Sequence, residues 1–187
     1  MTTSAAPYLT PAPHAWLDVW QQPVLAECVT KHVPDALDTM TEEAYVHTVP
    51  LLLGGLGKDG VRDFYATYVV AQMPADLESS LMSRTIGEDR IVEESVFRLT
   101  HSLIMDWWLP GVPPTGKRIE VAVVGLIQCR AGKIAHEQLS WDQASVLVQW
   151  GLFAEPTRPV AGVASARRLL DPSVPMNALM RRAHGTG

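Results

Sequence analysis

A row of hydrogen-bonding side chains occupies every second position of one short segment. Its members are His136, Gln138, Ser140 and Asp142. A carboxylate and an imidazole can take up and return a proton, so this row could support general acid/base catalysis, with the amide and hydroxyl orienting a substrate oxygen. Because strand side chains alternate, the four should share one face. That face is the wall of a pocket if it is concave, or else the solvent side of a sheet.

Asp142 is the main catalytic candidate because it lies between two different elements. The segment before it follows a Gly132-Lys133 turn and alternates like a strand, whereas Val146 and Trp150 after it are spaced as in a helix. At such a junction a carboxylate can cap the helix or project from the sheet rim into a cavity. Both interpretations stay open here.

The proton-carrying partner of Asp142 is expected to be either His136 or His101. His101 lies in a strand expected over residues 90–108, where its side chain should be on the same face as those of Phe97 and Leu99. The alternative is a core histidine that is satisfied by hydrogen bonds.

Aromatic and polar residues nearby are candidates for substrate contact. Trp107 and Trp108 would point to opposite faces of a continuing strand, so at most one lines a cavity, and we expect Trp107. Asp106 should hydrogen-bond the proline-rich turn that follows. Tyr45 and Tyr65 complete the candidate set, together with Gln138 and Ser140.

The spacing of the histidine, acidic and serine residues matches neither a metal site nor a nucleophilic serine. The acidic and histidine residues show no H-x-x-x-H pair or facial triad, so no metal site is expected. No G-x-S-x-G elbow surrounds Ser102 or Ser140, which argues against a nucleophilic serine.

The periodicities predict an α+β domain in which a curved antiparallel sheet wraps around N-terminal helices and encloses a pocket. Helices are expected over 16–29, with a kink or break at Pro23, and over 33–37, 61–72, 143–152 and 164–170. Strands are expected over 45–49, 77–86, 90–108, 117–130 and 134–141. The glycine-rich segment 54–60 is expected to be a plain loop. We divide the chain into a flexible leader (1–13), the domain (14–152) and an extension (153–187) that packs on the domain or on a partner subunit.

Composition narrows the possible partners and location. The chain has 187 residues, a net charge of −5 and 47% apolar residues, which argues against a nucleic-acid surface. It contains neither a signal-like N-terminus nor a membrane-length apolar run. A cytoplasmic protein without a nucleic-acid or membrane partner is therefore expected. The expected partner, a small apolar organic substrate, follows from the pocket and not from the composition.

Two segments, THSLIMDWWLPGVPPTGK and GKIAHEQLSWDQASVLVQWGL, resemble the SnoaL-like polyketide cyclase branch of the nuclear-transport-factor-two-like superfamily. The resemblance covers Trp16 to Leu170. Within that branch, the chain most resembles a carboxymethylenebutenolidase-like group, in which the last strand has a sequence similar to HEHIYWDQ. Here Gln138 and Ser140 replace a histidine and a tyrosine, which changes pocket polarity and volume. The resemblance implies a cone-shaped α+β barrel with an internal pocket, commonly a homodimer, without organic cofactor, and with acid/base catalysis at Asp142.

Three functional hypotheses follow. The leading one is an isomerase or cyclase acting on a polyketide-like or terpenoid carbonyl compound, with Asp142 as proton carrier. The second is hydrolysis of a lactone or epoxide by water that Asp142 activates. The third is a non-catalytic protein that binds a small molecule, with Asp142 serving mainly as a helix cap.

Overall fold

The computed structural model describes residues 32–153 and 160–184. The expected leader (1–13), the helical segment expected over 16–29, and residues 154–159 and 185–187 of the expected extension lie outside these ranges. Within the described residues, no helix has both the length and the apolar character needed to cross a membrane.

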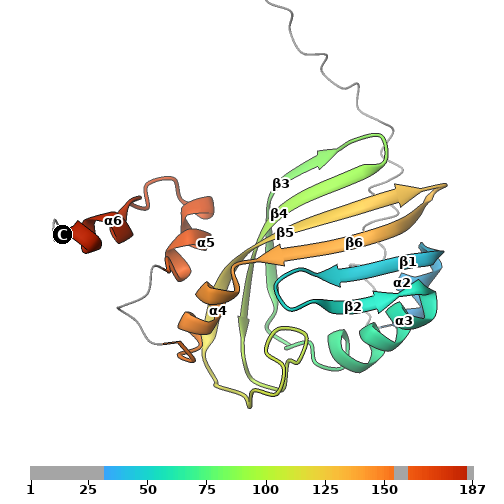
Figure 1. The fold of residues 1–187 in the computed structure, drawn as a ribbon, viewed down its shortest axis with the longest axis horizontal. Coiled ribbons are helices and arrows are strands. Elements are labelled where there is room, and N and C mark those ends of the chain that lie inside the picture. The colour runs from blue at the N-terminus through green and yellow to red at the C-terminus, as the bar shows by residue number, and fades with distance from the viewer. Residues whose placement is uncertain (1–31, 154–159, 185–187) are drawn as a thin grey trace, which may run out of the picture.

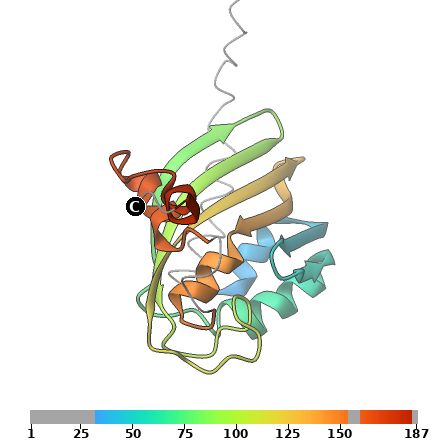
Figure 2. The same ribbon diagram turned by 60° about the vertical axis from the view of Figure 1, so that its left-hand side comes forward.

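A single curved sheet of six strands forms the body of the fold (Figures 1 and 2). Its strands, in the spatial order β2-β1-β6-β5-β4-β3, are β2 (Leu53–Leu56), β1 (Met40–Thr48), β6 (Lys133–Trp141), β5 (Arg118–Arg130), β4 (Arg90–Thr100) and β3 (Glu78–Ile86). Neighbouring strands are antiparallel except β1 and β6, which are parallel. The expected α+β class is confirmed, and the sheet remains unclosed.

Helices cover one face of the sheet and enclose the core. They are α2 (Val33–Asp38), α3 (Gly57–Phe64) with a π-helical continuation η2 (Tyr65–Val69), and α4 (Gln143–Gln149). α3 packs against β1 and β2. Its apolar face places Val61 and Phe64 in the core, because these residues lie three apart on the helix. The core therefore lies between the concave face of the sheet and these helices.

The glycine-rich segment is not the loop that was expected. Gly54 and Gly55 belong to β2, and Gly57 begins α3. A Cβ atom on Gly55 would lie 2.3 Å from the backbone carbonyl carbon of Gly60. The backbones of β2 and α3 thus approach more closely than any side chain permits, which fixes α3 over the sheet.

The long strand expected over residues 90–108 is also corrected. β4 ends at Thr100, and residues 101–117 form a loop that returns to β5. Trp108 lies fully buried in this loop, with its ring centroid 5.4 Å from that of Trp141 and 6.1 Å from that of Trp150. Large aromatic side chains, rather than strand pairing, therefore anchor the loop.

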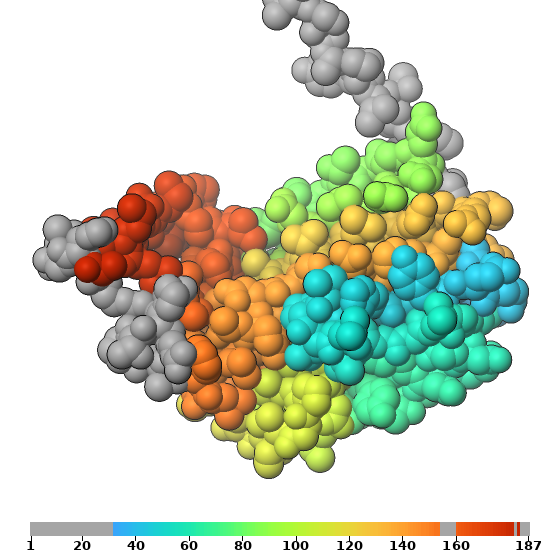
Figure 3. All heavy atoms as spheres, viewed as in Figure 1, coloured from blue at the N-terminus to red at the C-terminus, as the bar shows by residue number. Residues whose placement is uncertain are grey.

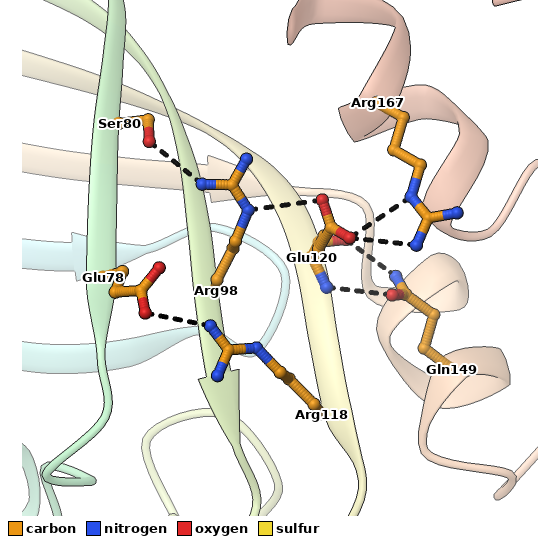
Figure 4. Close-up of polar contacts among 7 residues, drawn as sticks. All are labelled: Glu78, Ser80, Arg98, Arg118, Glu120, Gln149 and Arg167. Carbon is orange, nitrogen blue, oxygen red and sulfur yellow. Dashed lines mark hydrogen bonds and ion pairs between the residues drawn. The ribbon is translucent and has the colours of Figure 1, made fainter.

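The C-terminal helices α5 (Val163–Leu170) and α6 (Ala178–His184) stand out to one side of this body (Figure 3). α5 packs against β5, and its Ala166 is fully buried. Figure 4 shows the polar contacts at this junction. Glu120 on β5 accepts hydrogen bonds from Arg167 of α5 and Arg98 of β4, and its backbone exchanges two bonds with the Gln149 side chain.

We predict that Gly55→Ala lowers the free energy of unfolding by about 3 kcal/mol, because the added methyl group must push two backbones apart. Urea denaturation monitored by circular dichroism measures the change. Gly87→Ala is the matched control, because a Cβ there meets the Arg90 carbonyl at an ordinary 3.5 Å. Equal stability of the two variants would contradict the close approach of β2 and α3.

Candidate active site

A largely apolar cavity of about 150 Å³ lies between the concave face of the sheet and the segment from α3 to β3. Five strands (β1, β3, β4, β5 and β6), α3, η2 and the loops before β3 and after β4 contribute its lining residues: Val46, Thr48, Phe64, Tyr65, Val69, Met73, Leu77, Ser79, Glu93, Ser95, Phe97, Trp107, Val123, Gly125, Glu137 and Leu139. Two carboxylic acids, Glu93 and Glu137, interrupt the apolar lining. Such a site, enclosed and with few polar groups, is the usual form of a small-molecule binding site.

Glu137 is the most unusual residue of the cavity. It lies on β6 in register with Val46 of β1 and Ile127 of β5, both buried, and is itself only 4% exposed. The Tyr65 hydroxyl donates a hydrogen bond to its Oε2 at 2.6 Å. A buried carboxylate needs such partners, because removing a charge from water is costly.

Burial raises the pKa of Glu137 from 4.5 to about 6. The hydrogen bond from Tyr65 lowers that pKa, and the negative charge of Glu93 raises it. Desolvation is the largest cause, because the low-dielectric surroundings disfavour the charged form. A carboxyl group with a pKa in this range can both accept and return protons near neutral pH.

Glu93 is held differently from Glu137. Arg84 on β3 donates from its Nε to Oε1 of Glu93 at 2.5 Å, as β3 and β4 pair these two residues directly. Both side chains are partly exposed, Glu93 to 14% and Arg84 to 23%. The guanidinium thus forms an ion pair with the Glu93 carboxylate. The cavity therefore contains one ion-paired carboxylate and one carboxyl group that burial pushes toward its neutral form.

The π-helical turn aims Tyr65 at Glu137. The backbone N–H of Val70 bonds to the Tyr65 carbonyl at 2.8 Å, an i to i+5 bond. Tyr65 and Val69 lie four residues apart, so they face the same side of this turn and both line the cavity. The sequence pattern predicted a continuous α-helix over 61–72 and gave no signal for this turn.

Asp142 caps α4 and is exposed. Its Oδ1 accepts hydrogen bonds from the backbone N–H groups of Ala144 (3.0 Å) and Ser145 (3.3 Å), and its Oδ2 accepts one from the Ser145 hydroxyl (2.6 Å). It does not line the cavity. The geometry supports the helix-cap interpretation and gives no support to Asp142 as a proton carrier.

The polar row of β6 lies on the opposite face from the cavity. Glu137 and Leu139 line the cavity, so the alternation of the strand turns His136, Gln138 and Ser140 away from it. The ring of His136 stacks on that of Tyr45 at a centroid distance of 3.8 Å. Burial and the neighbouring His47 lower the pKa of His136. The four polar side chains do not line the cavity, so of the two interpretations left open by the sequence the structure does not support the pocket wall, on which Gln138 and Ser140 had been expected to contact substrate.

The remaining candidates divide between the cavity and the 101–117 loop. Trp107 and Tyr65 line the cavity, as expected. His101 is fully buried outside the cavity lining, and its Nδ1 accepts a hydrogen bond from the Thr115 backbone N–H at 3.2 Å. Asp106 accepts bonds from the Gly111 backbone and the Gln72 amide. His101 and Asp106 thus shape the loop.

Glu137 and Glu93 were not among the site residues expected from sequence. The sequence held one signal for Glu137. Its side chain should be on the same strand face as those of Leu139 and Trp141, and burying a carboxylate among apolar side chains costs free energy, so such a residue often has a function. Glu93 gave no comparable signal, because acidic residues surround it in the sequence.

We predict that the unsubstituted protein loses on the order of 2 kcal/mol of unfolding free energy between pH 4 and pH 8 through Glu137, and that Glu137→Gln does not show this loss. The folded state holds the Glu137 proton more tightly, so the contribution of this group to stability is present below pH 4.5 and lost as pH rises through about 6. Urea unfolding at both pH values measures it. Glu43→Gln, at an exposed position of β1, controls for the lost charge. Identical pH dependence in both variants would count against a raised pKa.

Comparison with known proteins identifies the family. The model of the SnoaL-like polyketide cyclase family matches residues 21–150. One similar solved structure, from Jannaschia sp. CCS1, is named after the SnoaL-like polyketide cyclases. It is 18% identical in sequence, and the match covers 81% of this chain and 100% of that chain with a TM-score of 0.61. TsrD from Streptomyces laurentii is 16% identical (77% and 100% covered, TM-score 0.59), and IdmH from Streptomyces antibioticus is 19% identical (72% and 97%, TM-score 0.54).

These structural likenesses, all under 25% identity, concern the fold alone. No protein of curated function matches the sequence. The family model spans well over half of the chain, and the open six-stranded sheet with its cavity agrees with it. The protein therefore belongs to the SnoaL-like polyketide cyclase family.

Proposed function

We propose that the protein is a cofactor-independent isomerase or cyclase acting on a polyketide-like or terpenoid carbonyl compound, with Glu137 as the proton carrier. The observation that carries the proposal is the buried Glu137 carboxyl group, which faces an apolar cavity and has a pKa raised to about 6. Membership of the SnoaL-like family supports the reaction class. Glu137 takes the role first given to Asp142.

In the proposed mechanism, ionised Glu137 removes a proton from the carbon beside the substrate carbonyl, and the electron pair of that C–H bond forms an enolate. In an isomerisation, protonated Glu137 returns the proton to another carbon. In a ring closure, the enolate carbon bonds to a second carbonyl, whose oxygen then receives the proton. Both routes are balanced without a cofactor.

The cavity also offers groups to bind the substrate oxygen. Tyr65 and Ser95 carry hydroxyl groups on its lining. We propose the Ser95 hydroxyl as a donor to the carbonyl oxygen, where negative charge develops, because the Tyr65 hydroxyl already donates its proton to Glu137. The apolar surroundings strengthen such contacts, because little water competes for them.

We predict that Glu137→Gln slows the exchange of α-protons of 2-cyclohexenone for deuterium by about 10²- to 10⁴-fold, because the amide cannot accept the proton. Proton NMR in D2O follows the exchange. Asp142→Asn is the control, since asparagine also caps helices and Asp142 lies outside the cavity lining. A rate lost in Asp142→Asn and kept in Glu137→Gln would refute the assignment. Opening of a lactone with ¹⁸O from labelled water in the new carboxylate would instead indicate hydrolysis.

Two substitutions should move the pH dependence of that exchange in opposite directions. Tyr65→Phe removes a hydrogen bond that lowers the pKa of Glu137, so the rising limb near pH 6 should move to higher pH. Glu93→Gln removes a negative charge that raises the same pKa, so the limb should move to lower pH. Profiles of exchange rate against pH test both. A shift in the same direction for both variants would show that another group governs the limb.

A further inference from the structure

We infer that the natural substrate is an uncharged compound of a single ring, and that Gly125 on the cavity floor sets this size. The inference rests on the proposed function for the kind of compound, a carbonyl compound that Glu137 deprotonates. The size and charge limits stand on the cavity itself.

The volume of the cavity is the first argument. An apolar cavity of the 150 Å³ seen here is just large enough for benzene, whereas sites for larger organic ligands measure roughly 300–1,000 Å³. Phe97 and Trp107 line it with flat aromatic surface, which suits a ring. A compound of several fused rings would need several times this space to bring its reacting carbon to Glu137.

Gly125 is the second argument. It lies in the middle of β5, directly between Glu93 of β4 and Leu139 of β6, and all three line the cavity. Its backbone does not require glycine, since its φ is not positive. A Cβ here would meet Leu139 Cδ2 at 3.5 Å and Ile127 Cδ1 at 3.6 Å, which are ordinary contacts.

The missing side chain of Gly125 therefore has no local structural need. A glycine inside a strand weakens the strand and often marks a place where a ligand approaches the backbone closely. Its effect here is to leave open the space between the two carboxyl-bearing strands. Substitution at this position adds bulk to the cavity without a clash of backbones.

Charge is the third argument. Glu93 and Glu137 both face the cavity, and the arginine near them, Arg84, already binds Glu93 and is not part of the lining. An anionic ligand would meet one carboxylate and a second carboxyl group without a free cation on that lining. An uncharged ring that bears a carbonyl or enol oxygen avoids this repulsion and can accept the available hydroxyl hydrogen bonds.

The test is isothermal titration calorimetry of the full chain at pH 8 with three probes. Phenol has one ring and an enol-like hydroxyl, 2-naphthol adds a second ring, and benzoate adds a negative charge to one ring. Phenol should bind, and 2-naphthol and benzoate should each bind at least about tenfold more weakly. Binding of 2-naphthol or benzoate as tight as that of phenol, or absence of phenol binding, overturns the inference.

Substitutions in the cavity lining test which residues set the size limit for the ligand. Gly125→Val should weaken phenol binding by about tenfold or more and Gly125→Ala by less, whereas Leu139→Ala should strengthen 2-naphthol binding. Val124→Ile is the matched control, because Val124 is the preceding residue of β5, is 40% exposed and lies on the other face. Circular dichroism confirms that each variant is folded. Unchanged phenol binding in folded Gly125→Val overturns the role of Gly125.

These outcomes are separate from those that test the proposed function. The probes report binding without turnover, and loss of the deuterium exchange in Glu137→Gln reports chemistry without regard to size. A protein that prefers phenol while Glu137→Gln retains full exchange would keep the size limit and lose the catalytic assignment. The reverse result would lose only the size limit.

Discussion

The burial of one carboxyl group, that of Glu137, is the constraint on which the other features of this protein depend. Desolvation disfavours its charge, and the Tyr65 hydroxyl offsets part of that cost. Tyr65 directly follows α3 and begins the π-helical turn, and α3 is held close to β2 because Gly55 lets the two backbones meet. The fold thus positions a proton acceptor that water would otherwise hold near its ordinary pKa.

Much of the fold could be predicted from sequence because the strands of this sheet are half-buried. Alternation is strong in β5, where buried positions recur at every second residue from Ile119 to Cys129, and the Ala131-Gly132 turn fixes its hairpin with β6. Two elements were predicted wrongly for local reasons. Gly54 and Gly55 resemble a loop unless their close neighbour is known, and the apolar residues after Thr100 resemble a strand although they pack as an aromatic cluster.

The site could be predicted only in part, because alternation assigns side chains to two faces without saying which is concave. That choice depends on where α3 and the 101–117 loop pack, which involves contacts distant in sequence. The polar residues of the sequence pointed to the row of His136, whereas Glu137, the residue that we propose as proton carrier, lies on the more apolar face that lines the cavity. Asp142 shows the same difficulty, since a carboxylate at a strand-to-helix junction suits a cap as well as a catalyst.

The most direct test of the central claim is the titration of Glu137 itself by ¹³C NMR of the side-chain carboxyl carbon, assigned by comparison with Glu137→Gln. We expect a midpoint near pH 6, well above the ordinary value of 4.5, because burial raises the pKa of this carboxyl group. A midpoint at or below 4.5 would show that the carboxylate is solvated or strongly paired. It would then have no special capacity to exchange protons near neutral pH, and the proposed chemistry would lose its basis.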